Sequence, residues 1–321
     1  MALSFKYFIS LTLFLGLFLI STAHGNTIPS TGDIDASNST LDKRDDKVKL
    51  RILPLGASIT WGLLSETHNG YRKPLRDQLR WKGYEVDMVG TRSNGEMKDK
   101  DVEARSGDTI DEVREAAQGS LPYKPNVVLI NAGTNDCAQE IDIKNAHTRM
   151  HKLINSLVKA DGMKDTLIVL STLIPSHKKQ TAEHRPAVNK QYRQLVKSMK
   201  NEGINIVLAD MDPEAPDPGH GWLKWPKDYT HGDKADSTHP NDYGYSKMAY
   251  VWWKALEKAL KDDLIKDPQP WDSGSTCADD NGKSKRSIKT FVQKLYSRCK
   301  KSDHTGDDGP IKDPKLPEMP Q

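Results

Sequence analysis

The chain has 321 residues, with 47 Lys and Arg against 44 Asp and Glu and a formal net charge of +3. Eight of the basic residues, and no acidic one, fall within 283–301, so the rest of the chain sums to −5 (3 − 8). This distribution argues against a nucleic-acid-binding core, in which basic residues line the folded surface. The three cysteines are too few for a disulfide framework. Cys277 could pair with Cys299 or with Cys137, and the sequence leaves both pairings open.

The first 25 residues have the pattern of a secretory signal peptide. A positive charge at Lys6 precedes an uncharged, apolar stretch at 7–20, and small residues follow. This stretch of about 14 residues is shorter than the ~20 needed to span a bilayer, and polar sequence comes next. We therefore expect a secreted, extracellular protein without stable membrane insertion.

Residues 26–47 are polar and without periodicity, so we expect a disordered segment that could act as a propeptide. They contain the sequon Asn38-Ser39-Thr40, whose asparagine is a glycosylation acceptor in an exported protein. The apolar pattern stops again after about residue 262, which leaves 48–262 as one folded domain. For residues 263–321 we expect a basic, mostly disordered tail, with a short amphipathic helix at 288–299 as the alternative.

Within this domain, short runs rich in Val, Ile and Leu alternate with longer amphipathic stretches. The predicted strands are 50–55, 85–89, 126–131, 166–171 and 204–208. The predicted helices are 71–82, 109–118, 141–160, 184–201 and 242–261. The last three strands are continuously apolar, as in strands covered on both faces. The pattern predicts an α/β fold, a three-layer α/β/α sandwich around a five-stranded parallel sheet.

Polar blocks follow several of these strands, at the sheet edge where open parallel sheets bind ligands. The blocks are GAS at 56–58, RSGD at 105–108, GTND at 133–136 and DSTH at 236–239. A serine nucleophile needs a base within hydrogen-bond reach, and the base needs an orienting acceptor. Asp236 lies three residues before His239, so its carboxylate can hold one nitrogen of the imidazole ring. The pattern therefore predicts Ser58 as nucleophile, His239 as base and Asp236 as its partner, and we expect Asp236 to raise the pKa of His239.

These blocks resemble the SGNH hydrolase superfamily, also called GDSL-type esterases, over about 50–260. The stretches LRILPLGASITWG, SLPYKPNVVLINAGTNDC and STHPNDYGYSKMA are most similar to secreted fungal-type esterases related to carbohydrate esterase family 3. The resemblance implies a flavodoxin-like fold and a triad of Ser58, Asp236 and His239. It also implies an oxyanion hole formed by Ser58, Gly107 and Asn135. Asn135 with its neighbour Asp136 could instead be a helix cap.

The resemblance further implies hydrolysis of a carboxylic ester through an acyl-enzyme, with no cofactor and no metal. The expected partner is an acylated polysaccharide such as acetyl xylan, and we expect a monomer. The alternatives are a lipid or lysophospholipid esterase, and a catalytically degenerate carbohydrate-binding or host-interaction protein. Two departures from the family stand out: Ala57 replaces its usual Asp, and Ala104-Arg105-Ser106 precedes Gly107.

Two further interpretations depend on side-chain environment. The loop at 212–235 holds Trp222, Trp225 and Tyr229, which either bind substrate or pack the loop onto the domain. Asp210 and Asp212, with the Asp and His of the DSTH block, are an alternative metal site without a clear ligand motif.

Overall fold

The computed structural model describes residues 47–212 and 223–270. The predicted signal peptide, the sequon at Asn38 and Trp222 lie outside these ranges, as do Cys277 and Cys299. The predictions made for them therefore remain predictions.

The core of the domain is a sheet with the strand order β3-β4-β1-β5-β6-β7, in which β2 also pairs with β1. The parallel strands in the middle are β1 (Leu50–Gly56), β5 (Val127–Asn131), β6 (Leu167–Ser171) and β7 (Ile206–Ala209). Every residue of β5 and β6 is buried, because helices cover both faces of the sheet. The predicted parallel sheet between helix layers is confirmed.

The sheet has seven strands rather than five: the predicted strand 85–89 is β2, and two strands that were not predicted, β3 and β4, follow it. β2 (Val86–Met88) pairs with the beginning of β1, and β4 (Asp101–Ala104) pairs with its end. β3 (Arg92–Ser93) runs antiparallel to β4. β3 and β4 were not predicted because they contain no apolar run. One of the buried residues of β4, Glu103, is a carboxylate that accepts hydrogen bonds from Thr91 and Ser120.

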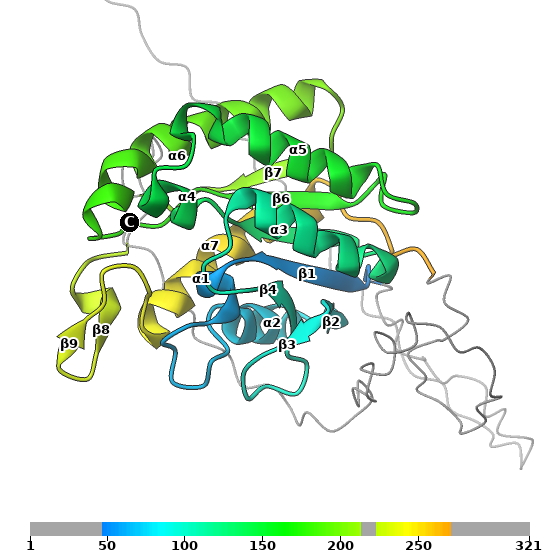
Figure 1. Cartoon of the computed structure of the whole chain (residues 1–321). Coiled ribbons are helices and arrows are strands. Elements are labelled where there is room, and N and C mark those ends of the chain that lie inside the picture. Colours follow the sequence, from blue (N-terminus) through cyan, green and yellow to red (C-terminus); the bar gives the residue numbers. More distant parts are fainter. Residues whose placement is uncertain (1–46, 213–222, 271–321) are drawn as a thin grey trace, which may run out of the picture. The chain divides into compact units, whose positions relative to one another are not determined.

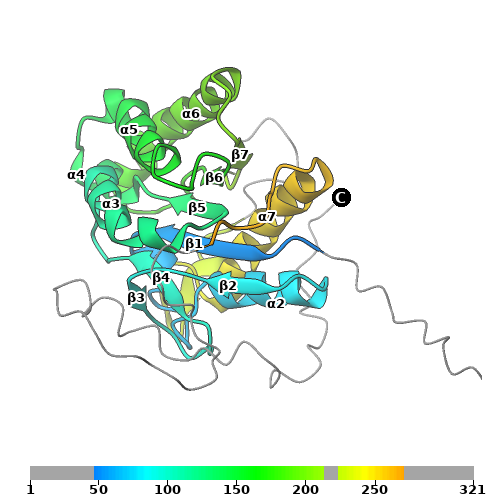
Figure 2. The ribbon, with the colours of Figure 1, turned by 90° about the vertical axis from the view of Figure 1, so that its right-hand side faces the viewer.

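Helices cover the two faces of the sheet, as Figures 1 and 2 show. α2 (Arg72–Trp81) and α7 (Asp242–Lys261) pack together on one face. α3 (Ile110–Ala117), α5 (Ala146–Val158) and α6 (Lys179–Asn201) cover the other. Each face has its own cluster of buried apolar side chains, so the sheet separates two cores.

The remaining elements are short. Two helices begin directly after strand ends, α1 (Ser58–Trp61) after β1 and α4 (Thr134–Gln139) after β5. The 3₁₀ helices are η1 (Gln118–Tyr123), η2 (Ile143–Asn145) and η3 (Lys227–Tyr229). β8 (Thr230–His231) and β9 (Lys234–Ala235) form a two-stranded hairpin. The 3₁₀ helix η2 falls within the predicted helix 141–160, and the others were not predicted because they are too short for a periodic pattern.

The domain extends beyond the boundary expected at residue 262. Ile265 is buried in the core beside α7, although it follows the last helix. The Asn205 side chain donates to the Leu264 carbonyl at 2.7 Å, and the Asn126 side chain donates to the Lys266 carbonyl at 2.6 Å. The chain therefore packs onto the amino ends of the strands for several residues after α7.

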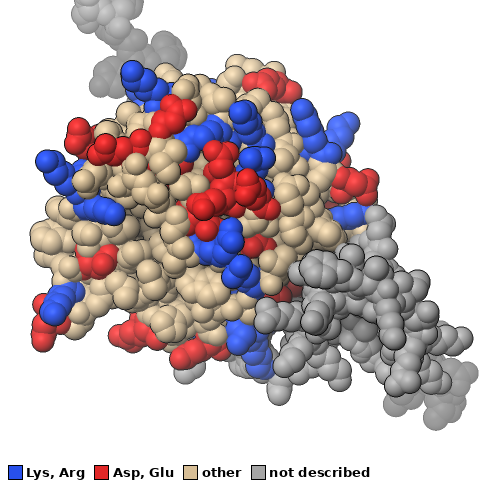
Figure 3. Space-filling view, viewed as in Figure 1, with Lys and Arg blue, Asp and Glu red and all other residues tan. Residues whose placement is uncertain are grey.

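The surface in Figure 3 carries Lys and Arg side chains interspersed with Asp and Glu. Within 47–212 and 223–270, no helix has the length and apolar character that crossing a membrane would require.

Candidate active site

Ser58 is positioned by a tight strand-to-helix turn. A Cβ on Gly56 would lie 2.3 Å from the Asn131 carbonyl oxygen and 2.5 Å from Thr60 Oγ1, so only glycine fits at the end of β1. Ser58 then opens α1 with 8% of its surface exposed. Ala57 precedes it with a buried methyl group, where the family pattern has a carboxylate.

Ser58, His239 and Asp236 form one continuous hydrogen-bonded path, although Ser58 and His239 are 181 residues apart in the sequence. Asp236 Oδ1 lies 3.0 Å from His239 Nδ1 and accepts a hydrogen bond from its N–H, which leaves Nε2 as the unprotonated ring nitrogen. Ser58 Oγ lies 2.9 Å from Nε2 and can donate to it. The structure thus brings together the three residues predicted for the triad.

The loop that carries His239 is held from three sides. Asp236 Oδ1 also accepts hydrogen bonds from the backbone amides of Thr238 at 2.7 Å and of His239 at 2.6 Å. The Ser237 carbonyl accepts from the His177 amide at 2.6 Å. The His239 carbonyl accepts from His231 Nε2 at 3.1 Å, which requires a proton on that nitrogen. The imidazole of His239 therefore has little freedom to turn away from Ser58.

Burial lowers the pKa of His239 below its ordinary value of 6.5, because the charged imidazolium loses hydration. Attraction to Asp236 raises this pKa and repulsion from His231 lowers it, but burial has the largest effect. Asp236 thus raises the pKa of His239 as expected, but burial outweighs this effect, so the net pKa is lowered and not raised. For Asp236, burial raises the pKa, but hydrogen bonds from the amides of His239 and Thr238, together with the His239 imidazole, outweigh burial and the net pKa is lowered.

This electrostatic balance predicts the acid side of the pH profile. His239 can accept the proton of Ser58 only as a neutral imidazole. Because its pKa is lowered, His239 stays neutral down to a lower pH than an ordinary histidine. We expect kcat/KM for p-nitrophenyl acetate to reach half its plateau below pH 6.5, the ordinary histidine value. A pH titration of kcat/KM between pH 4 and 8 measures this. A midpoint above 6.5 would show that attraction to Asp236 outweighs burial.

The loop before α3 and the start of α4 together form a candidate oxyanion hole. Gly107 has φ of +94°, and nothing lies within 4 Å of where its Cβ would be. This left-handed backbone suits glycine, and the space above it is open to a ligand. Asn135 Nδ2 donates to the neighbouring Asp108 carbonyl at 2.8 Å, which leaves its other N–H to meet a ligand.

The structure excludes the helix-cap interpretation of Asn135 and leaves its oxyanion role as a prediction. The N-cap of α4 is Gly133, at φ of +117°, and no side chain caps this helix. Asn135 is the second residue of α4 and its amide points to the loop at 105–108. The cap interpretation is wrong for Asn135.

Comparison with known proteins decides the family. Residues 55–247 match the GDSL-like Lipase/Acylhydrolase family. This chain belongs to that family of carboxylic ester hydrolases. The predicted SGNH resemblance is thereby confirmed.

The relatives of this GDSL-family chain include carbohydrate esterases. A multidomain esterase of Ruminococcus flavefaciens is 30% identical over 240 residues, which is 66% of this chain and 29% of that protein, so the chain spans under a third of this curated relative. The Clostridium thermocellum family 3 carbohydrate esterase has a TM-score of 0.55 at 21% identity, over 67% of this chain and 99% of that one. A family 3 carbohydrate esterase from Talaromyces cellulolyticus has a TM-score of 0.53 with the same identity and coverage. These two structures share the fold.

Asp136, beside Asn135 in the GDSL-family chain, links the two halves of the candidate oxyanion hole. Its carboxylate is fully buried, accepts the Ile110 amide at 3.0 Å and pairs with Arg149. Ile110 opens α3, directly after the loop that carries Gly107. The sequence offered no indication of this, because Arg149 lies in the middle of an ordinary amphipathic helix.

We expect Asp136→Asn to reduce turnover as well as stability. Breaking a buried ion pair costs about 3–5 kcal/mol of unfolding free energy, and a shift of the two loops should lower kcat roughly 10- to 100-fold. Asp99→Asn is the matched control. Asp99 is also buried, accepts the Met88 amide at 3.0 Å and pairs with Arg76 at 2.8 Å. Equal losses of kcat in the two variants, measured beside their thermal melts, would contradict a specific role for Asp136.

The loop residues predicted to bind substrate differ in burial. Tyr229 is only 1% exposed and its hydroxyl donates to the Pro175 carbonyl at 2.7 Å, so its predicted substrate contact is wrong. It packs the loop onto the domain, next to a buried ion pair between Asp228 and Lys247. Trp225 is exposed and lies beside the DSTH block, where its Nε1 donates to the Asp236 carbonyl at 3.2 Å.

Two of the carboxylates considered for a metal site form ion pairs with arginine side chains. Asp210 pairs with Arg193 at 2.7 Å, and Asp212 pairs with Arg185 at 2.5 Å. In the part of the chain that the structure describes, no three His, Cys, Asp or Glu side chains are grouped to hold a metal ion. Cys137 is buried, and burial raises the pKa of its thiol to about 12.

Proposed function

We propose that this protein is a secreted serine esterase that removes acetyl groups from an acetylated polysaccharide such as acetyl xylan. The path from Ser58 through His239 to Asp236, with Gly107 and Asn135 at the same edge of the sheet, carries the proposal. The polysaccharide is supported by the carbohydrate esterases among the protein's relatives. Secretion is supported by the signal-peptide pattern of residues 1–25.

Acylation begins when His239 Nε2 takes the proton from Ser58 Oγ, and Oγ attacks the carbonyl carbon of the ester. The carbonyl oxygen becomes an oxyanion, which the backbone amides of Ser58 and Gly107 and the Asn135 side chain stabilise. The tetrahedral intermediate then collapses. Its bond to the alcohol oxygen breaks, the protonated His239 gives its proton to that oxygen, and the acyl group stays on Ser58.

Deacylation repeats these steps with water. His239 takes a proton from water, the resulting hydroxide oxygen attacks the acyl carbon, and the same donors hold the second oxyanion. Collapse releases the carboxylic acid and returns the proton to Ser58 Oγ. Asp236 stays ionised throughout, because its hydrogen bonds lower its pKa, and it stabilises the imidazolium formed in both halves.

The test is to assay the purified protein on nitrophenyl esters of rising chain length, and to measure acetate release from acetylated xylan. We expect the highest kcat/KM on acetyl esters and release of acetate from the polymer. Faster hydrolysis of long-chain esters or lysophospholipids would favour a lipid esterase. Labelling of Ser58 by a fluorophosphonate without any turnover would favour the degenerate binding protein. Amino-terminal sequencing of protein from the culture medium tests the proposed cleavage near residue 25.

A further inference from the structure

We propose that the open face of Trp225, supported from behind by His177, binds a sugar ring of the polysaccharide that carries the ester. This inference rests on the proposed function and names a part of the substrate that the triad does not touch. It assigns a role to His177, which follows β6 and forms no ion pair within the residues that the structure describes.

The indole of Trp225 is held on one face and at its nitrogen edge. The imidazole of His177 stacks on it with a centroid distance of 4.1 Å and an interplanar angle of 29°. Its Nε1 donates to the Asp236 carbonyl at 3.2 Å, and the His177 amide donates to the adjacent Ser237 carbonyl at 2.6 Å. Trp225 is nevertheless 43% exposed, and because His177 covers one face of the indole, we infer that the other face is the open one.

Such a surface suits a pyranose ring. A flat aromatic face can cover the C–H side of a sugar while the sugar hydroxyls remain in water. Because its position is fixed before binding, little side-chain freedom is lost when a ligand stacks on it. The indole hydrogen-bonds to the carbonyl of Asp236, and the carboxylate of Asp236 holds His239, so Trp225 lies next to the triad loop, where we expect a polymer whose ester is at Ser58 to reach it.

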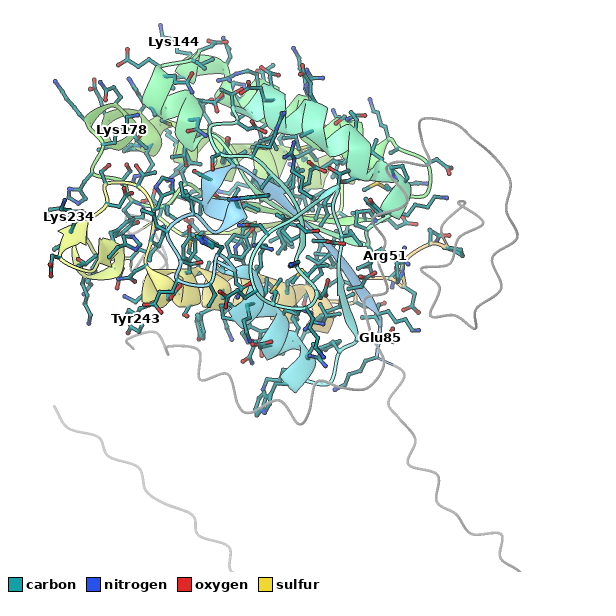
Figure 4. The ribbon with its side chains drawn as sticks, turned by 60° about the horizontal axis from the view of Figure 1, so that its bottom comes forward. Arg51, Glu85, Lys144, Lys178, Lys234 and Tyr243 are labelled. Atoms are coloured by element: carbon teal, nitrogen blue, oxygen red, sulfur yellow. The ribbon has the colours of Figure 1, made fainter. Side chains whose placement is uncertain are left out.

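The surroundings of Trp225 argue against an acyl chain at this position. An alkyl chain gains affinity in an enclosed apolar pocket, and the neighbours here are polar. His177 stacks on the indole, Lys178 follows His177 in the chain, and Lys224 precedes Trp225; all three are exposed. Figure 4 shows Lys178 and Lys234 on this side of the molecule, while Arg51 and Glu85 lie at the opposite end of the strands.

Trp81 offers a matched control within the same chain. It is 42% exposed and one side of its ring also carries a neighbouring group, Lys82 Nζ at 4.5 Å from the centroid. It lies at the end of α2, however, and not on the loop of the triad. The two tryptophans are therefore almost equally exposed, but only Trp225 lies beside the triad loop and is hydrogen-bonded to it.

The experiment compares Trp225→Ala with Trp225→Phe on p-nitrophenyl acetate and on acetylated xylo-oligosaccharides. Both variants lose the bond to the Asp236 carbonyl, but only phenylalanine retains an aromatic face. We expect the KM for the oligosaccharides to be roughly fivefold to tenfold higher in the alanine variant than in the phenylalanine variant. The two variants should hydrolyse p-nitrophenyl acetate alike, and Trp81→Ala should match the wild type on both substrates.

A binding measurement separates this inference from the proposed function. Deacetylated xylo-oligosaccharides should bind Ser58→Ala and lose roughly fivefold to tenfold in affinity when Trp225→Ala is added. Suppose that the wild type hydrolyses p-nitrophenyl acetate but the two Trp225 variants have equal oligosaccharide KM and affinity. The proposed sugar site on Trp225 is then wrong, and the proposed esterase function is retained. If p-nitrophenyl acetate is not hydrolysed while oligosaccharides bind through Trp225, the proposed esterase function is wrong and the proposed sugar site is retained.

Discussion

Ser58→Ala is expected to lower kcat on p-nitrophenyl acetate by about 10⁴- to 10⁶-fold. The substitution removes the atom that forms the acyl-enzyme and leaves His239 Nε2 without its partner at 2.9 Å. Only the oxyanion donors and substrate binding then accelerate attack by water. The melting temperature should change little, because the substitution removes a single hydroxyl and its one hydrogen bond to His239.

The measurement combines kinetics with a fluorophosphonate probe, which should label the wild type once, at Ser58, and leave Ser58→Ala unlabelled. Ser246→Ala is a suitable control, because it removes a hydroxyl that bonds only within α7, to the Asp242 carbonyl. A chelator should leave the wild-type rate intact, since no step of the proposed reaction passes through a metal. Labelling of Ser58→Ala, or a rate that a divalent ion restores after chelation, would refute the serine mechanism.

Asn135→Ala is expected to lower kcat by about 100- to 1000-fold, or 3–4 kcal/mol, with KM nearly unchanged. The side chain would donate to charge that appears only in the transition state, so its loss should affect turnover and not substrate binding. Stability should fall by only about 1 kcal/mol, from the lost bond to the Asp108 carbonyl.

Asn135→Asp sharpens the same test. Aspartate has the shape of asparagine but cannot donate when ionised, and it places a negative charge beside the developing oxyanion. We expect it to be at least as inactive as the alanine variant. Steady-state kinetics and thermal melts of both variants decide the question, and near-normal turnover of Asn135→Asp would remove Asn135 from the oxyanion hole.

Some errors of the sequence analysis share one physical origin. Tyr229 was grouped with Trp225 because both are aromatic residues of one loop, but Tyr229 is buried and Trp225 is exposed. The pKa of His239 was expected to rise from its pairing with Asp236, but burial lowers it. Both depend on what the rest of the chain packs around a side chain, and no local pattern carries that information.

The sequence by itself determined the parallel sheet, since the buried strands are continuous apolar runs, and the order of the blocks that hold Ser58, Asn135 and His239. It could do so because strand burial and strand-end turns leave local patterns of residues. Only the tertiary structure decided that Asn135 faces the Asp108 loop instead of capping α4, and that Asp136 joins Arg149 to the start of α3. It also placed Glu103 within β4, where Thr91 and Ser120 satisfy its charge. These contacts join residues up to tens of positions apart, and a polar side chain becomes buried only where such distant partners meet it.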